Sequence, residues 1–135
     1  MALRGYRLLV VDDQADAREL MTAILTGAGA HVETAGSVPD ALRQIEVARP
    51  DALLADLGMP GVDGYALIRE VRSRDAENGR HLPAAAITAY AADRDRQRAV
   101  AAGFDCHVSK PISRSAVVDA VRSICRGPDH GSTMR

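Results

Sequence analysis

Short apolar runs alternate along the chain with longer segments in which apolar residues recur every three or four positions. The short runs have the length of strands and end at turn residues, as buried strands of a parallel sheet do, and the longer segments have the spacing of helices. The pattern predicts strands at residues 8–11, 31–35, 52–56, 83–88 and 104–109. It predicts helices at residues 15–28, 38–49, 64–71, 91–102 and 114–125, and a polar loop over 72–82.

Five strand–helix units in succession imply parallel strands joined by helical crossovers, with helices on both faces of the sheet. We therefore predict an α/β fold built on a doubly wound, five-stranded parallel sheet. Right-handed crossovers leave few topologies, and the strand order 2-1-3-4-5 is one of the two common ones. Ser37, Asp63 and Ser113 precede three of the predicted helices and are expected to cap them.

Composition and charge narrow the function classes. The 135 residues suffice for one domain with a sizeable core. The net charge of −1, with both signs spread along the sequence, argues against direct nucleic-acid binding. No apolar run approaches the roughly 20 residues that span a bilayer, and no signal peptide is recognisable, so we expect a cytoplasmic domain with no membrane segment. Cys106 and Cys125 are expected to be buried thiols in a reducing compartment.

Polar side chains stand where four of the predicted strands end. Asp12 and Asp13 follow the first strand, and Asp56 ends the third. Thr88 ends the fourth strand, and Lys110 follows the fifth. With the strand order given above, these five residues meet at the edge where open α/β sheets bind their ligands.

The chemistry of this edge is constrained by its charges. Three neighbouring carboxylates raise one another's pKa, and a hard divalent cation relieves their repulsion. Mg²⁺ suits the site because it takes few carboxylates and keeps several waters. A cation beside a lysine ammonium can hold a phosphoryl group, which one carboxylate accepts as an acyl phosphate. The Thr88 hydroxyl is suited to hydrogen-bond a phosphoryl oxygen.

From Leu8 to about Ile124 the chain resembles the receiver domain of two-component response regulators. The matching motifs are V-V-D-D at 10–13, D-L-G-M-P-G-V-D-G at 56–64, I-T-A-Y at 87–90, which includes Ala89, and S-K-P at 109–111. The resemblance implies the flavodoxin-like (βα)5 receiver fold over residues 1–126, and we expect a disordered tail at 127–135. It also implies phosphorelay signalling by a domain that catalyses only its own phosphorylation and dephosphorylation.

The resemblance assigns roles to the acidic residues. Asp56 is expected to accept the phosphoryl group from a phosphohistidine. Mg²⁺ is expected to be bound by Asp13, Asp56 and the Gly58 backbone carbonyl, with Asp12 acting through water. Gly58 and Tyr90 occupy the two places that tune hydrolysis of the acyl phosphate in this family.

The remaining roles concern the switch. Lys110 is expected to contact carboxylate and phosphoryl oxygens, Thr88 to be the switch hydroxyl, and Pro111 to follow a cis peptide bond. The place of the family's switch aromatic is taken by His107. We hypothesise that His107 moves inward as Thr88 turns towards the phosphoryl group, and the alternative is an imidazole that fills the end of the fifth strand.

The expected partners follow from the same resemblance. A histidine kinase or a histidine phosphotransfer protein is expected to dock at the first helix. The face formed by the fourth helix, the fifth strand and the fifth helix is expected to carry the output, and it is also a candidate homodimer surface. The arginines at 94, 96 and 98 either contact a partner or form a solvated face. The I-T-A-Y-A string and the lead-in at 3–5 favour a receiver attached to a hybrid sensor kinase over a stand-alone receiver.

Three other classes share parts of this pattern. A receiver-like interaction module that is not phosphorylated usually lacks an acidic residue or the lysine, and here all are present. A Mg²⁺-dependent aspartyl-phosphate phosphohydrolase of the haloacid dehalogenase type needs a second aspartate where Gly58 stands. A nucleotide- or flavin-binding protein of flavodoxin type needs a phosphate-binding loop that the sequence lacks.

Overall fold

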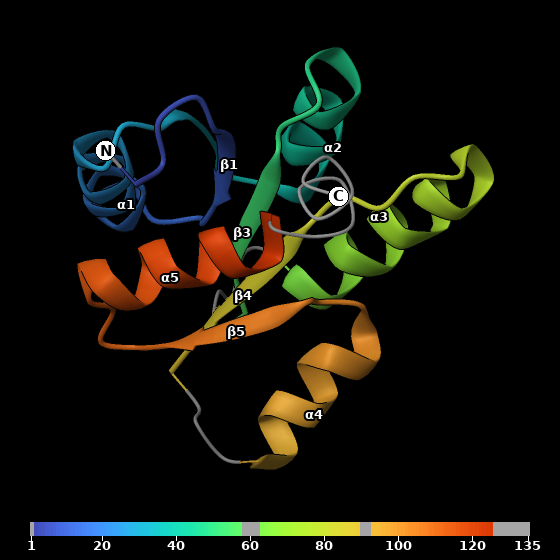
Figure 1. The fold of residues 1–135 in the computed structure, drawn as a ribbon. Coiled ribbons are helices and arrows are strands. Elements are labelled where there is room, and N and C mark those ends of the chain that lie inside the picture. The colour runs from blue at the N-terminus through green and yellow to red at the C-terminus, as the bar shows by residue number, and fades with distance from the viewer. Residues whose placement is uncertain (1, 58–62, 90–92, 126–135) are drawn as a thin grey trace, which may run out of the picture.

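The computed structural model describes residues 2–57, 63–89 and 93–125. It contains one sheet of five parallel strands in the order β2-β1-β3-β4-β5, so the predicted topology is confirmed. Figure 1 shows the strands side by side, with α1 and α5 on one face of the sheet and α2, α3 and α4 around the other.

The strands and helices alternate along the whole chain, as the sequence predicts. The strands are β1 (Arg7–Val11), β2 (His31–Ala35), β3 (Ala52–Asp56), β4 (Ala84–Thr88) and β5 (Cys106–Ser109). The helices are α1 (Ala15–Gly27), α2 (Val38–Val47), α3 (Gly64–Asn78), α4 (Asp93–Ala102) and α5 (Arg114–Cys125). No helix in the described parts of the chain is long and apolar enough to cross a bilayer.

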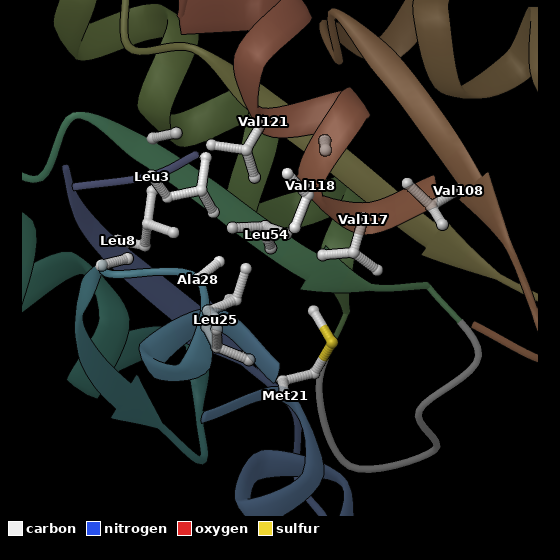
Figure 2. Packing of buried hydrophobic residues seen from close by; sticks show 14 of the residues in the cluster. Leu3, Leu8, Met21, Leu25, Ala28, Leu54, Val108, Val117, Val118 and Val121 are labelled. Atoms are coloured by element: carbon white, nitrogen blue, oxygen red, sulfur yellow. The ribbon is translucent and has the colours of Figure 1, made fainter. Parts of the chain in front are cut away.

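Alternate residues of a strand face opposite sides of the sheet, which gives the protein two cores. Leu9 and Leu53 pack with side chains of α2, α3 and α4. Leu8 and Leu54 pack with side chains of α1 and α5. Figure 2 shows this second core, in which Leu54 lies among residues of α1, α5 and the segment before β1. Because both faces of β1, β3 and β4 are covered, their apolar runs are uninterrupted in the sequence.

The predicted loop over 72–82 is wrong in its first part, because α3 continues to Asn78. Between residues 72 and 78 only Asp75 is buried, and its contacts are charged instead of apolar, so apolar spacing does not reveal this part of the helix. Asp75 is 4% exposed and accepts hydrogen bonds from Arg49 at 2.9 Å and from Arg72 at 3.1 Å. The pair with Arg49 therefore ties α3 to the segment after α2, and the pair with Arg72 lies within α3 itself.

Asp75 also caps the loop that follows the helix. The backbone N–H of Leu82 donates to Asp75 Oδ2 at 2.7 Å. Burial by itself raises the pKa of Asp75, but the Leu82 N–H and the Arg49 guanidinium outweigh burial and lower it. Asp75 therefore stays a carboxylate inside the protein, where it serves as a structural acceptor.

The three predicted N-caps are confirmed. The side chains of Ser37, Asp63 and Ser113 each accept hydrogen bonds from backbone N–H groups two or three residues further along the chain, at 3.0–3.2 Å. Each cap satisfies a backbone donor that the first turn of a helix leaves unpaired. Asp63 thus has the structural role of starting α3.

The two cysteines are free thiols, and each is half-buried instead of buried as expected. Burial, and then the nearby carboxylate of Asp105, raises the pKa of Cys106 to about 11. Burial and the carboxylates of Asp51 and Asp105 raise the pKa of Cys125 to about 11 as well. Both side chains are therefore protonated at neutral pH, and neither is a ready nucleophile.

Candidate functional site

The predicted acidic edge forms at the carboxyl ends of β1 and β3, which are neighbours in the sheet. Val11 pairs with Ala55, so Asp12 and Asp56, the next residue of each segment, come together at this edge. Asp56 pairs in turn with Ile87 of β4, whose next residue is Thr88. The strand order thus collects residues that are far apart in the sequence.

Asp12 is held firmly beside Asp56. Its side chain is nearly buried, and its Oδ1 accepts a hydrogen bond from Gln14 N at 2.9 Å. Burial, and the neighbouring Asp56 carboxylate, raise the pKa of Asp12, although the Gln14 N–H and Lys110 work in the opposite direction. Asp13 is half-buried, and its Oδ1 is fully shielded from solvent. Negative charge is therefore concentrated at this edge.

Asp56 and Lys110 form an ion pair across the site. Asp56 is 4% exposed, and the Lys110 ammonium donates to Asp56 Oδ2. A buried carboxylate is costly without a cation, and Lys110 offsets that cost. The lysine side chain is 39% exposed, so the pair lies at the surface end of the site and not in the core.

Thr88 and the start of the β5–α5 loop complete the site. Thr88 is buried at the end of β4, and its carbonyl accepts a hydrogen bond from Lys110 N at 2.8 Å. Ala89 follows and is exposed. The peptide bond between Lys110 and Pro111 is cis, as expected. The main chain therefore brings Thr88 and Lys110 together at the carboxyl end of β4, beside the strand that ends at Asp56.

His107 lies on β5 and contacts α4 of the same chain. Arg96 Nε donates to His107 Nε2 at 3.0 Å, which places the imidazole proton on Nδ1. Burial and the positive charge of Arg96 lower the pKa of His107. The inward movement of His107 stays a prediction.

The arginines of α4 differ from one another. Arg96 contacts β5 through His107, and the Arg98 guanidinium lies 4.3 Å from the centre of the Tyr65 ring on α3. All three arginines are exposed, so the alternatives of a solvated face and a partner surface both stay predictions. The structure adds that Arg96 and Arg98 also join the fourth helix to β5 and α3.

Some predicted positions lie outside the described residues. These are Gly58 with its carbonyl, Tyr90 and the tail at 127–135. The roles expected for them stay predictions.

The donor set suits a hard cation. Carboxylates are the ligands that such ions prefer, and Asp12, Asp13 and Asp56 provide them at one edge. Among the residues that the structure describes, no three His, Cys, Asp or Glu side chains are grouped tightly enough to enclose a metal ion. A site with two carboxylates, one backbone carbonyl and several waters needs no such group, so the residues present fit an open, partly hydrated ion.

An apolar cleft of about 260 Å³ opens beside the acidic edge. Its walls come from α1, the ends of the central strands and the β5–α5 loop, and include Leu20, Met21, Pro111 and Ile112 next to Asp56. Leu20 is 53% exposed. A cleft of about 280 Å³ lies at the other edge of the sheet, lined by Arg7 and by residues of α2. The cleft beside Asp56 is the one that adjoins the reactive groups.

Sequence reasoning missed one contact at this site. Arg18 of α1 donates a hydrogen bond to the backbone carbonyl of Asp12 at 2.7 Å. A single arginine among the polar residues of an amphipathic helix is typical of a solvated position. Only the tertiary fold shows that this side chain turns back onto the acidic edge.

Comparisons with known proteins agree with this arrangement. The family model described as "Response regulator receiver domain" matches residues 8–122. An uncharacterised 14.6 kDa protein of Leptolyngbya boryana is 39% identical over 87% of this chain and 88% of its own length. The hybrid signal transduction histidine kinase D of Dictyostelium discoideum is 34% identical over 82% of this chain, which spans only 8% of that protein. A response regulator structure from Chloroflexus aurantiacus is 34% identical, with a TM-score of 0.80 over 89% of this chain and 97% of that one.

Proposed function

Because this chain belongs to the family of response regulator receiver domains, we propose that it accepts a phosphoryl group from a phosphohistidine onto Asp56 in a Mg²⁺-dependent reaction. The observation that carries the proposal is the ion pair between Asp56 and Lys110 beside Asp12, in a nearly buried site. It supplies a nucleophile, a cation for the phosphoryl oxygens and a second carboxylate at one edge of the sheet. The domain catalyses only its own phosphorylation and dephosphorylation.

In the proposed transfer an Asp56 carboxylate oxygen attacks phosphorus, and a new P–O bond forms. The P–N bond to the donor histidine breaks, and the imidazole nitrogen keeps its electron pair. Lys110 stabilises negative charge that develops on the phosphoryl oxygens, since its ammonium already reaches Asp56 Oδ2. Thr88 follows Ile87, the register partner of Asp56, and its hydroxyl is the proposed hydrogen-bond donor to the same phosphoryl group.

The residues suited to hold Mg²⁺ are Asp13, Asp56 and the Gly58 carbonyl, with Asp12 acting through water. When bound, the ion neutralises charge on the carboxylates and on the phosphoryl group, which eases attack by an anion on an anion. The raised pKa of Asp12 supports this proposal, because burial and then the neighbouring Asp56 carboxylate disfavour its charged form, and a bound cation would offset both effects.

The proposed phosphodonor is a histidine kinase or a histidine phosphotransfer protein. The apolar cleft beside Asp56, with its half-exposed Leu20, offers such a partner a contact surface next to the nucleophile. The proposed output surface is the face of α4, β5 and α5, which also serves as a candidate homodimer contact. Arg96 and His107 join α4 to β5 there, and Val100 of α4 is 57% exposed.

Intact-mass spectrometry after incubation with acetyl phosphate tests the chemistry. We expect one phosphoryl adduct on the wild type that requires Mg²⁺ and disappears in Asp56→Asn. Asp119→Asn, which removes an exposed carboxylate of α5, is the matched control and should keep the adduct. A wild type that gains no adduct with Mg²⁺ would indicate a receiver-like interaction module instead. An adduct that survives in Asp56→Asn would place the acceptor elsewhere.

A further inference from the structure

We propose that Arg18 is a positioning residue for the acidic edge. Its contact with the main chain of Asp12 fixes the direction of the peptide that joins Asp12 to Asp13, and thereby sets the affinity of the site for a divalent cation. This inference rests on the proposed function, because it concerns the cation that the phosphoryl transfer uses.

The first observation is the contact itself. Arg18 is half-buried on α1, and its Nη1 donates to the Asp12 carbonyl oxygen at 2.7 Å. That oxygen belongs to the peptide unit between Asp12 and Asp13. A peptide unit is planar, so holding its oxygen also fixes its N–H and the start of the next residue. Arg18 therefore controls how the Asp13 side chain leaves the main chain relative to Asp12.

The second observation is that the two other hydrogen bonds described for Asp12 are made by its N–H and by its side chain. Asp12 N donates to Ala35 O at 3.1 Å, which continues the sheet up to that residue. Gln14 N donates to Asp12 Oδ1 at 2.9 Å, which fixes the side chain. Neither contact involves the Asp12 carbonyl. Among the hydrogen bonds described here, Arg18 is what orients it.

The third observation is the space made for the guanidinium. A Cβ built on Gly36 would lie 3.1 Å from Arg18 Nη1, 3.6 Å from its Cζ and 3.9 Å from the Asp12 carbonyl oxygen. The guanidinium thus occupies room that a side chain at this position would fill. Gly36 lies between β2 and the Ser37 cap of α2. The hydrogen bond from Arg18 thus joins α1 to the end of β1, and Gly36 in the turn after β2 leaves the space in which it forms.

The hydrogen bond from Arg18 acts on the site by fixing the position of the main chain, more than by the charge of the guanidinium. Arg18 donates to a main-chain carbonyl and not to a carboxylate of the site. A substitution that keeps the positive charge but shortens the reach should therefore not restore the site fully. Residues that orient metal ligands from behind typically change metal affinity by about 10-fold to 100-fold when removed.

The test measures cation affinity in two ways. Thermal unfolding is followed at rising Mg²⁺ concentration, because an ion that binds the folded site raises the melting temperature of the protein. The rate of phosphorylation by acetyl phosphate is measured over the same concentrations. For Arg18→Met we expect the half-saturating Mg²⁺ concentration to rise about tenfold in both measurements, with the rate at saturating Mg²⁺ within about twofold of wild type. Arg18→Lys, which keeps a donor and the charge, should fall between the two.

Arg114→Met is the matched control. Arg114 likewise donates to a backbone carbonyl, that of Gly27 at 3.3 Å, but Gly27 is the last residue of α1, at the end of the helix away from Asp12. Its removal should leave the half-saturating Mg²⁺ concentration unchanged.

Gly36→Val tests the same hydrogen bond by filling the space beside the Arg18 guanidinium. The added side chain should displace the guanidinium and raise the half-saturating concentration in the wild-type background. It should have little further effect in Arg18→Met, because coupled residues give non-additive changes. This variant and Arg18→Lys carry the test if Arg18→Met does not fold.

Three results would overturn the inference about Arg18. An unchanged half-saturating concentration in Arg18→Met, alongside a wild type that binds Mg²⁺ and gains a phosphoryl group, overturns the inference alone. A lower rate at saturating Mg²⁺ with an unchanged half-saturation point overturns it too, since that would make Arg18 a general structural residue. A wild type that shows neither Mg²⁺-dependent stabilisation nor an adduct overturns the proposed function and this inference together.

Discussion

His107 couples its protonation state to the position of α4. In its neutral form the imidazole Nε2 accepts a hydrogen bond from Arg96, and a protonated imidazole has no lone pair to offer there. Burial and the Arg96 charge lower its pKa. The nitrogen that accepts the hydrogen bond from α4 is thus the one that acid protonates. His107 stands at the place where the family has its switch aromatic.

The pH dependence follows from this shift. The pKa of His107 in the folded protein lies below the ordinary value of 6.5. The unfolded chain therefore binds more protons between the two values, and the contribution of neutral His107 to stability is present above the unfolded value and lost as pH falls through the folded one. From about pH 7.5 to about pH 5.5 we expect His107→Gln to lose less of its free energy of unfolding than the wild type does.

Urea denaturation at a series of pH values measures this difference, and the imidazole NMR titration gives the pKa directly. Arg96→Ala is the control, because removing one cause of the shift should move the pKa of His107 upwards. A His107 that titrates at or above the ordinary value would contradict the prediction.

At the scale of elements, the length of α3 depends on how the helix ends. Gly79 adopts φ 64°, a left-handed conformation, and the N–H there bonds to Asp75 O. This is a common helix stop, and glycine takes it without the steric cost that a Cβ imposes. The ion pairs of Asp75 and the turn at Gly79 together fix where the charged half of α3 stops.

Gly79→Ala should therefore destabilise the protein by about 1 kcal/mol. Gly27→Ala is the matched control, since Gly27 ends α1 without a positive φ and a Cβ there meets nothing within 4 Å. It should be neutral or stabilising by up to about 1 kcal/mol, because alanine favours the helix. The two free energies of unfolding come from chemical denaturation. Equal effects of the two substitutions would contradict the role given to Gly79.

At the scale of the whole molecule, the segment before β1 closes one of the two cores. Leu3 is fully buried and lies beside Leu8, Ala28 and Val121, as Figure 2 shows. Its N–H donates to Ala28 O at 2.9 Å. The lead-in to β1 is thus part of the fold and seals the layer between α1 and α5.

Leu3→Ala should lower the free energy of unfolding by about 3 kcal/mol, because it opens a cavity in a packed core. Leu20→Ala serves as the control: Leu20 is 53% exposed, and its loss should change stability by no more than about 0.5 kcal/mol. Both values are measured by urea denaturation monitored by circular dichroism. A small effect at Leu3 would mean that the segment does not seal the core.

The sequence by itself determined the order of elements, the topology and the edge at which the polar residues gather. Each of these depends on short-range patterns, since apolar runs define buried strands and the strand order then brings Asp12, Asp56 and Lys110 together. The helix caps were equally predictable, because a cap needs only one side chain and the next turn of the same segment.

The tertiary structure alone decided contacts between charged residues of different elements. The second half of α3 is held by Arg49 and Asp75, α4 by Arg96 and His107, and the acidic edge by Arg18. A charged residue in a polar stretch has the same local pattern whether it is solvated or paired. What distinguishes the two is the position of a partner far away in the chain, and only the folded protein brings that partner within reach.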